Sequence, residues 1–108
     1  MSTMYKGVTP PFSFTLPNEV DLTDAESVYV TITNLKHKLL LEKDQDELTI
    51  AAHQVDVFLT QQETLAMPSG RILIQLNWTY NQGGQLKRAC SDVIEETFKN
   101  NLKNEVIA

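Results

Sequence analysis

Apolar and polar residues alternate with a period of two along most of the chain, which is the pattern of strands that bury one face. Residues 12–16 place phenylalanines on one face and hydroxyl side chains on the other, and residues 28–33 repeat the pattern with valines and an isoleucine. Residues 71–80 form a longer alternating segment. Shorter segments at 38–43, 48–50 and 55–59 complete a series with the spacing of a meander or sandwich. We therefore expect one all-β domain over residues 1–108.

The inward-facing residues of these strands make up the predicted core. A chain of 108 residues has the usual size of one domain and buries roughly two-thirds of its unfolded surface. Trp78 is expected to be the largest core residue. The predicted members are Phe12, Phe14, Val28, Val30, Ile32, Leu48, Ile50, Val57, Leu59, Ile74, Leu76 and Trp78.

Two connectors carry specific local signals. Thr60 and Glu63 have the spacing of a capping box, which predicts a short helical turn near residues 60–66. Gly83 and Gly84 supply the positive-φ positions of a hairpin turn. The segment after the glycines is therefore expected to return antiparallel to the strand that contains Trp78.

The segment after this hairpin turn permits two interpretations. Ile94, Phe98, Leu102 and Val106 recur every four residues, as on one face of a helix, whereas residues 86–98 also fit a strand. We favour the strand because the hairpin turn demands a partner for the preceding one. The C-terminal tail 99–108 and the N-terminal residues 1–8 are then expected to be extended or helical.

Composition narrows the classes of function. Apolar residues make up 42% of the chain and charged residues 21%, which is the ordinary mix of a globular protein. The net charge is -5, with nine basic and fourteen acidic residues, so we expect neither nucleic acid nor an anionic membrane as a partner. No apolar run is longer than that of Leu39-Leu40-Leu41, which is far shorter than a membrane span or the apolar part of a signal peptide. We expect synthesis in the cytoplasm.

Side chains able to carry chemistry are few and scattered. His37 and His53 lie in polar turns or strand ends without an accompanying metal motif, and Cys90 is expected to be a small buried side chain. We expect the carboxylates to bond their own turns or to point to opposite faces of a strand, so the sequence predicts no catalytic, cofactor or metal residues and no enzyme. The carboxylate pairs are Asp21 and Asp24, Asp44 and Asp46, and Glu95 and Glu96.

Aromatic residues leave a second functional hypothesis open. Tyr29, Tyr80 and Trp78 would form a sugar-binding platform if they stood together on an exposed face. The alternation places Trp78 inward and Tyr29 outward, which favours core packing for the tryptophan. A carbohydrate or cell-surface binding module is therefore the alternative function.

The order of the segments also supports a resemblance that spans nearly the whole chain. The start is GVTPPFSFTLP, an Asp-Leu-Thr stretch leads to VYVT, and VDVFLTQQETL, IQLNWTY and a closing NEVI follow. LTQQETL after an alternating strand, together with IQLNWTY, is the most specific part. The chain resembles small structural proteins encoded in the tail regions of phages and prophages of Gram-positive bacteria, and more distantly the N-terminal domain of phage baseplate upper proteins.

This resemblance implies an immunoglobulin-like antiparallel β-sandwich of about seven strands that assembles with copies of itself or with other tail and baseplate proteins. None of the matching residues is catalytic in such proteins, so no site is carried over. The implied function is that of a virion structural module, assembled in the cytoplasm of the bacterial host. Since strand edges attract other strands, we expect a homo-oligomer.

Overall fold

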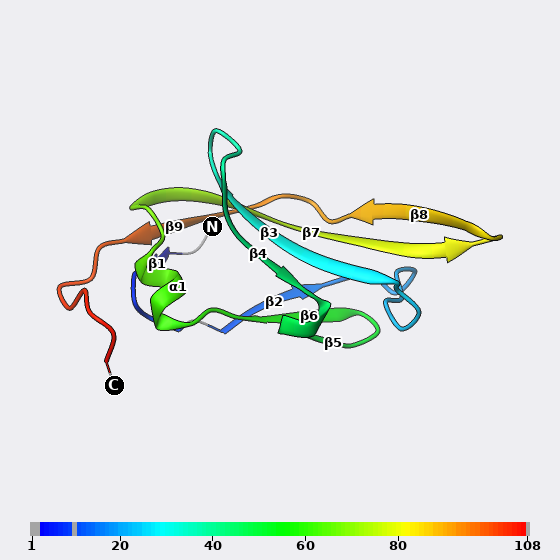
Figure 1. Ribbon diagram of the computed structural model, residues 1–108, viewed down its shortest axis with the longest axis horizontal. Helices are drawn as coiled ribbons and strands as arrows, with labels where there is room; N and C mark the ends of the chain where they lie inside the picture. The colour runs from blue at the N-terminus through cyan, green and yellow to red at the C-terminus, as the bar shows by residue number, and fades with distance from the viewer. Residues whose placement is uncertain (1–2, 10, 108) are drawn as a thin grey trace.

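The computed structural model describes residues 3–9 and 11–107, and it is built mostly of strands (Figure 1). Predicted termini that include residues 1–2 and 108 therefore lie partly outside the described residues. Two short helical segments interrupt the strands, a 3₁₀ turn η1 (Gln45–Glu47) and helix α1 (Gln61–Leu65). The strands are β1 (Thr3–Tyr5), β2 (Pro11–Thr15), β3 (Ser27–Asn34), β4 (Leu39–Asp44), β5 (Leu48–Ile50), β6 (Gln54–Phe58), β7 (Gly70–Gln82), β8 (Gln85–Cys90) and β9 (Ile94–Lys99).

The strands form two sheets that face each other across one core (Figure 1). The large sheet has six strands, with β1, β9, β7, β3 and β4 side by side in that order and β8 paired with β7. The small sheet has three strands in the order β2, β6, β5. The hairpin of β7 and β8 extends beyond the end of the small sheet, so the domain is elongated, with extents of 52 × 30 × 20 Å.

Two parts of the predicted architecture are wrong. The prediction of a wholly antiparallel fold fails at β1, which runs parallel to β9 with Thr3 opposite Thr97. The predicted strand 86–98 is broken into β8 and β9, and this break together with the unpredicted β1 brings the number of described strands to nine. The break occurs at Ser91, whose hydroxyl accepts a hydrogen bond from the Leu76 amide at 3.0 Å and so takes a position in the ladder that a backbone carbonyl would fill.

The chain ends are irregular beyond these strands. Residues 100–107 form no helix, although the repeat of apolar residues every four positions permitted one. Leu102, Val106 and Ile107 are exposed, so the tail contributes no packed face. Two side chains attach the tail to the domain. The Ser69 hydroxyl donates to the Asn100 side-chain oxygen at 2.6 Å, and the Gln61 side-chain amide exchanges hydrogen bonds of 3.0 and 2.8 Å with the backbone of Ile107.

The predicted core is largely confirmed. Nine of its members are buried, whereas Phe12, Leu48 and Ile50 are partly buried at its margin. Five of the residues that the prediction missed enter the core from loops, from the short β1 or from the segment with the ambiguous period, and two belong to the located strands β6 and β7. The additional buried apolar residues are Met4, Leu16, Leu22, Val55, Met67, Ile72 and Phe98.

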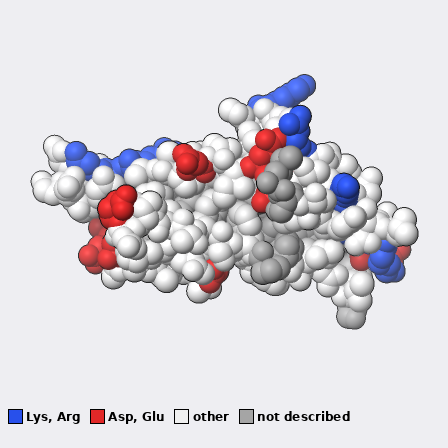
Figure 2. Space-filling model, turned by 180° about the vertical axis from the view of Figure 1, so that it is seen from behind, with Lys and Arg blue, Asp and Glu red and all other residues white. Residues whose placement is uncertain are grey.

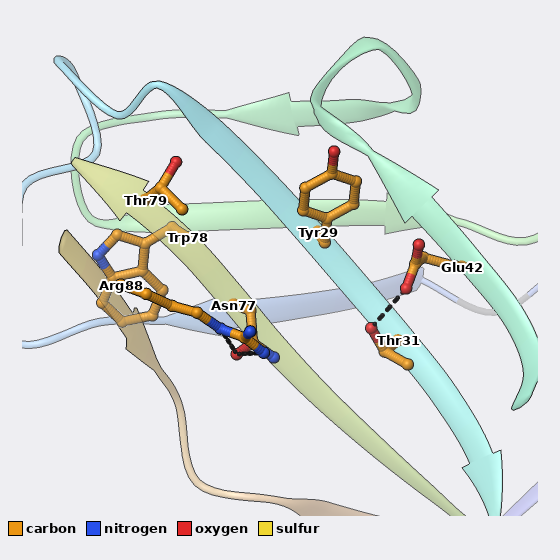
Figure 3. A pocket seen from close by; sticks show the side chains of 7 residues that line it. All are labelled: Tyr29, Thr31, Glu42, Asn77, Trp78, Thr79 and Arg88. Atoms are coloured by element: carbon orange, nitrogen blue, oxygen red, sulfur yellow. Dashed lines mark hydrogen bonds between the residues drawn. The ribbon is translucent and has the colours of Figure 1, made fainter. Parts of the chain in front are cut away.

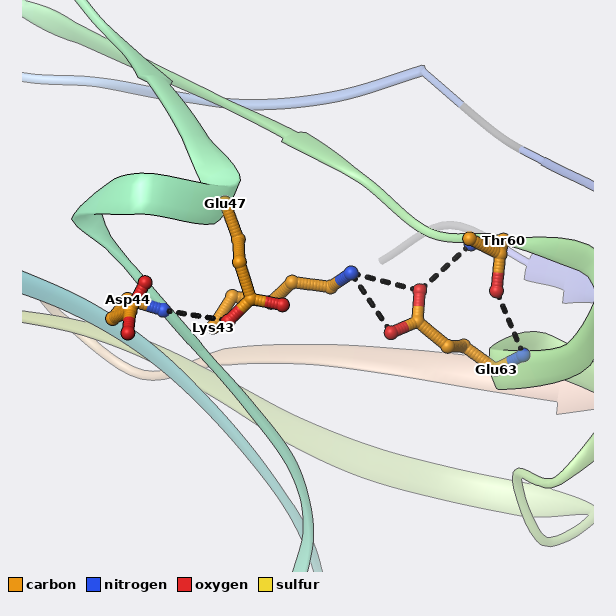
Figure 4. A network of polar contacts seen from close by, with 5 residues as sticks. All are labelled: Lys43, Asp44, Glu47, Thr60 and Glu63. Atoms are coloured by element: carbon orange, nitrogen blue, oxygen red, sulfur yellow. Dashed lines mark hydrogen bonds and ion pairs between the residues drawn. The ribbon is translucent and has the colours of Figure 1, made fainter.

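The predicted capping box begins α1, and its glutamate contacts a lysine of β4 (Figure 4). The Thr60 hydroxyl accepts from the Glu63 amide at 3.2 Å, and the Glu63 carboxylate accepts from the Thr60 amide at 2.8 Å. The same carboxylate pairs with the buried Lys43 amine at 2.8 Å. Burial raises the pKa of Glu63, but the hydrogen bonds from Lys43 and Thr60 outweigh it and lower the pKa below its ordinary value. Lys43 thereby ties β4 to α1.

Candidate interaction site

The two histidines lie apart and have structural surroundings. His37 is exposed in the turn after β3 and has a positive φ of 65°. His53, between β5 and β6, places its Nδ1 2.6 Å from the Val20 carbonyl oxygen, which fastens the loop before β3 to the small sheet. Among residues 3–9 and 11–107 there is no group of three or more His, Cys, Asp or Glu side chains that could hold a metal ion.

The predicted carboxylate pairs serve local structure. The Asp21 carboxylate accepts from the Thr23 amide at 2.8 Å, and hydrogen bonding by the Thr23 side chain and amide lowers the pKa of Asp21. Asp44 accepts from the Asp46 amide at 3.0 Å and caps η1. Glu95 points outward and pairs with Arg71 at 3.1 Å, whereas its neighbour Glu96 is buried on the opposite face. Asp21 and Asp44 therefore bond the backbone of their own turns, and the two glutamates point to opposite faces of β9.

The prediction for Cys90 is wrong, because its side chain is exposed. Cys90 is the last residue of β8 and lies opposite Asn77, on the outer face of the large sheet. No further strand covers β8 on its other side within the described chain. An apolar side chain at this position therefore remains in contact with solvent.

Strand edges are the most accessible recognition elements of this fold. In the large sheet, β8 pairs only with β7 and β4 only with β3 among the described strands. In the small sheet, β2 pairs only with β6. Each such edge carries unpaired backbone donors and acceptors that another strand could bind.

A cleft of about 490 Å³ opens between two of these edges, where the sheets separate. Its apolar walls include Phe14 and Leu16 at the β2 side and Trp78 and Ile94 from the large sheet. Ser91, in the break between β8 and β9, forms part of its polar rim. A cleft with apolar walls therefore lies beside unpaired backbone, which is the setting that strand addition requires.

A second hollow, of about 320 Å³, lies on the outer face of the large sheet (Figure 3). Its lining residues come from β3, β4, β7 and β8, and Tyr29 stands out from β3 between them. At the two sides, Thr31 donates to Glu42 at 3.1 Å, and Arg88 donates to the Asn77 side-chain oxygen from Nε at 3.2 Å and Nη2 at 3.1 Å. A guanidinium and a carboxylate thus flank a polar floor, and two aromatic residues, Tyr29 and Trp78, also line the hollow.

Charge is unevenly distributed over the edges. Lys87 and Arg88 are exposed on β8, and Figure 2 shows basic side chains along the hairpin end of the molecule. The opposite edge carries Glu42 on β4, followed by Asp46 on η1. None of these four residues is in an ion pair within the described part of the chain, where the pairs are Lys43 with Glu63, Arg71 with Glu95, and Lys103 with Glu105.

The comparisons with known proteins leave the family open. No protein-family model matches the sequence, and no curated protein matches it significantly. Among the residues that the structure describes, no helix has the length and apolar character needed to cross a membrane.

The sequence predicted that chemistry would be absent but did not identify the edges. Lys87 and Arg88 follow closely after the double glycine, which is a signal that a basic edge strand ends the hairpin. Recognising β8 as a separate edge strand required knowledge of the break at Ser91. Without the break, residues 86–98 form a single strand, and its first half is not distinguished from its second. Nothing in the sequence around Glu42 and Asp46 indicates that they lie at the opposite edge. Their position there depends on the order of strands in the sheet.

Proposed function

We propose that the chain is a non-catalytic structural module of a phage or prophage tail or baseplate, with an immunoglobulin-like arrangement of its two sheets, and that it acts through protein–protein assembly. Its partners are copies of itself and other tail proteins, and its destination is the virion. The resemblance in LTQQETL and IQLNWTY supports the context. The scattered histidines and the carboxylates bonded to their own turns support a role without catalysis.

The observation that carries the assembly role is the open cleft beside unpaired strands. Monomeric β proteins usually cover or shorten their edges, because exposed backbone groups recruit other strands. Here β8 is six residues long, and β2 borders a cleft with an apolar lining that reaches Trp78. A strand from a partner would gain both backbone hydrogen bonds and burial of this apolar lining.

Incorporation into particles tests this function. Particles produced by an intact prophage that encodes the chain are purified and probed by mass spectrometry. We expect the chain in particles at a fixed ratio to other tail proteins. A Trp78→Ala variant, which alters the cleft, is expected at a lower ratio, and circular dichroism checks that it is folded because Trp78 also belongs to the core. A Tyr5→Ala variant changes an exposed residue outside the cleft lining and serves as control. Wild-type chain missing from otherwise complete particles would overturn the proposal.

The outer hollow favours carbohydrate binding as the alternative function. Tyr29 is 39% exposed and has amide, carboxylate, hydroxyl and guanidinium groups around it, the set that recognises sugar hydroxyls together with an apolar sugar face. Tyr80 does not join it, because it is partly buried against the core and lines a separate hollow with Trp78. Binding on a glycan array that disappears in Tyr29→Ala would establish this alternative, and a flat array would dismiss it.

A further inference from the structure

The two edges of the large sheet are complementary in length, direction and charge. β4 and β8 each have six residues. β4 is antiparallel to β3, β3 to β7 and β7 to β8, so β4 runs antiparallel to β8. A second copy placed beside the first in the same orientation would therefore present its β4 antiparallel to β8, which is the direction of the other main pairings in this sheet.

The pairings within the large sheet fix the levels of the acidic and basic side chains. The pairings place Asp44, Tyr29, Asn77 and Cys90 in one row across β4, β3, β7 and β8. Arg88 is two residues from Cys90 and faces the same side of the sheet, as Glu42 does relative to Asp44. Through these pairings Arg88 is level with Thr79 and Glu42 is level with Gln75, four residues apart along β7. A second copy displaced by these four residues along the strands, about 13 Å, places its Glu42 opposite Arg88.

Backbone groups on the free side of β8 are available for this pairing. The Ser91 amide donates to the Leu76 carbonyl at 2.8 Å, which fixes the alternation of bonded positions along β7 and β8. By this alternation Lys87 and Ala89 bond to β7, while the amides and carbonyls of Leu86, Arg88 and Cys90 point away from it. The free edge thus offers regularly spaced donors and acceptors.

Symmetric pairing of like edges is disfavoured by the same charges. Two β8 strands side by side would bring Lys87 and Arg88 against their own copies, and two β4 strands would do the same with Glu42 and the acidic residues of η1. Pairing of unlike edges replaces repulsion by attraction. Such contacts run head to tail and produce a closed ring or an open filament.

We propose that β8 of one copy pairs with β4 of the next, so that the large sheet continues from subunit to subunit. This inference rests on the proposed assembly function and names its partner as a second copy of the same chain. The basic strand supplies Lys87 and Arg88, and the acidic edge supplies Glu42 and Asp46.

Charge exchange tests the pairing. Lys87→Glu/Arg88→Glu reverses the β8 edge, and Glu42→Lys/Asp46→Lys reverses the other edge without touching the cap residue Asp44. Each variant alone is expected to associate about tenfold or more weakly than wild type in light scattering after size-exclusion chromatography. An equimolar mixture, and one chain carrying all four changes, should regain the wild-type mass, because unlike edges then face each other again.

A proline separates backbone pairing from side-chain packing. Leu86→Pro removes an amide that points away from β7, so the hairpin is retained while the free edge is blocked. Leu86→Ala removes the side chain alone. We expect loss of association for the proline variant and near wild-type association for the alanine variant, with thermal unfolding by circular dichroism as the check that both are folded.

The outcomes separate this pairing from the broader function. Wild-type monomers at every concentration, variants of unchanged mass, or a mixture that does not recover would each overturn the β8–β4 pairing. If the chain is nevertheless present in particles and the β8 reversal lowers its incorporation, the occupant of that edge is a different tail protein and the assembly function stands. Absence from particles would reject the function itself, whatever the masses show.

Discussion

β8 and β9 pair with the same side of β7, yet their surroundings differ completely. β9 lies opposite residues 70–74 of β7 and has β1 as a second neighbour. β8 lies opposite residues 77–82, has no second neighbour in the described chain, and leaves all its side chains exposed except the partly buried Ala89. β8 and β9 are equally long. They differ in the number of neighbouring strands and in how far the small sheet covers their side chains.

The core explains which of the two strands stabilises the domain. Phe98 on β9 is 1% exposed and belongs to the same cluster as Ile72 and Met4 on the flanking strands. Leu86 on β8 is 65% exposed. The large sheet therefore has one region that supports folding and another that remains available for contacts (Figure 1).

Truncating one apolar residue in each strand gives the largest expected difference. Phe98→Ala should lower the free energy of unfolding by about 3–5 kcal/mol, because it removes a buried ring and leaves a cavity. Leu86→Ala should change it by less than about 0.5 kcal/mol, since the side chain is exposed. Urea denaturation of both variants measures the difference, and equal losses would show that β8 is packed in solution.

The contrast also shows where sequence patterns succeed. Strict alternation located β3 and the longest strand β7, and Gly83 and Gly84 predicted the hairpin, where both have the positive φ that its turn requires. The capping box placed α1 correctly. Each of these features depends on residues close together in the sequence, so local physical chemistry decides it.

The features that the sequence did not predict depend on residues that are far apart in the chain. β1 has three residues and no alternation long enough to recognise, and it becomes a strand because β9 lies beside it. Lys43 is charged but buried, since Glu63 neutralises it from a helix twenty positions away. The open edges and the cleft arise from the order of strands, which composition and periodicity do not encode.

The edge strand β4 differs from β8 through its anchor to α1, and removing that anchor gives the second-largest effect. Glu63→Ala leaves the Lys43 amine buried without its carboxylate and removes one half of the capping box, at a cost of about 2–3 kcal/mol. Urea denaturation at pH 7 measures this cost. Lys87→Ala on β8 is the matched control, because that lysine is exposed and makes no described ion pair. A similar loss in both variants would contradict the anchor.

The same carboxylate gives stability a defined pH dependence. Because the folded pKa of Glu63 is lowered from 4.5, the unfolded chain takes up this proton more readily than the folded one. The contribution is fully present above the unfolded pKa and is lost as the pH falls through the folded pKa. Glu63→Gln should flatten the decline of stability below about pH 4.5. A decline as steep as in wild type would assign it to other groups.

Substitution in the turn between β7 and β8 has the next-largest expected effect on stability. Gly84 has a φ of +80°, and a Cβ added there would have no atom within 4 Å, so Gly84→Ala costs only backbone strain, about 1–2 kcal/mol. Gly83→Asn should be nearly neutral, because asparagine tolerates the left-handed conformation at this position of the turn. Thermal unfolding compares the two. A tolerated alanine at 84 would mean that the hairpin turn adopts another form.

The smallest expected effect is a difference in hydrogen-exchange rate between neighbouring amides of β8. In the monomer, the amides of Leu86 and Arg88 should exchange with deuterium faster than those of Lys87 and Ala89, because only the latter bond to β7. In the assembled chain, the first two should become protected while the others change little. Hydrogen exchange followed by NMR reads this alternation residue by residue. Uniform protection along β8 in both states would indicate a packed surface without strand pairing. An alternation that disappears on assembly would locate the new hydrogen bonds at the free edge of β8. β9 offers no such edge, because β1 already flanks it.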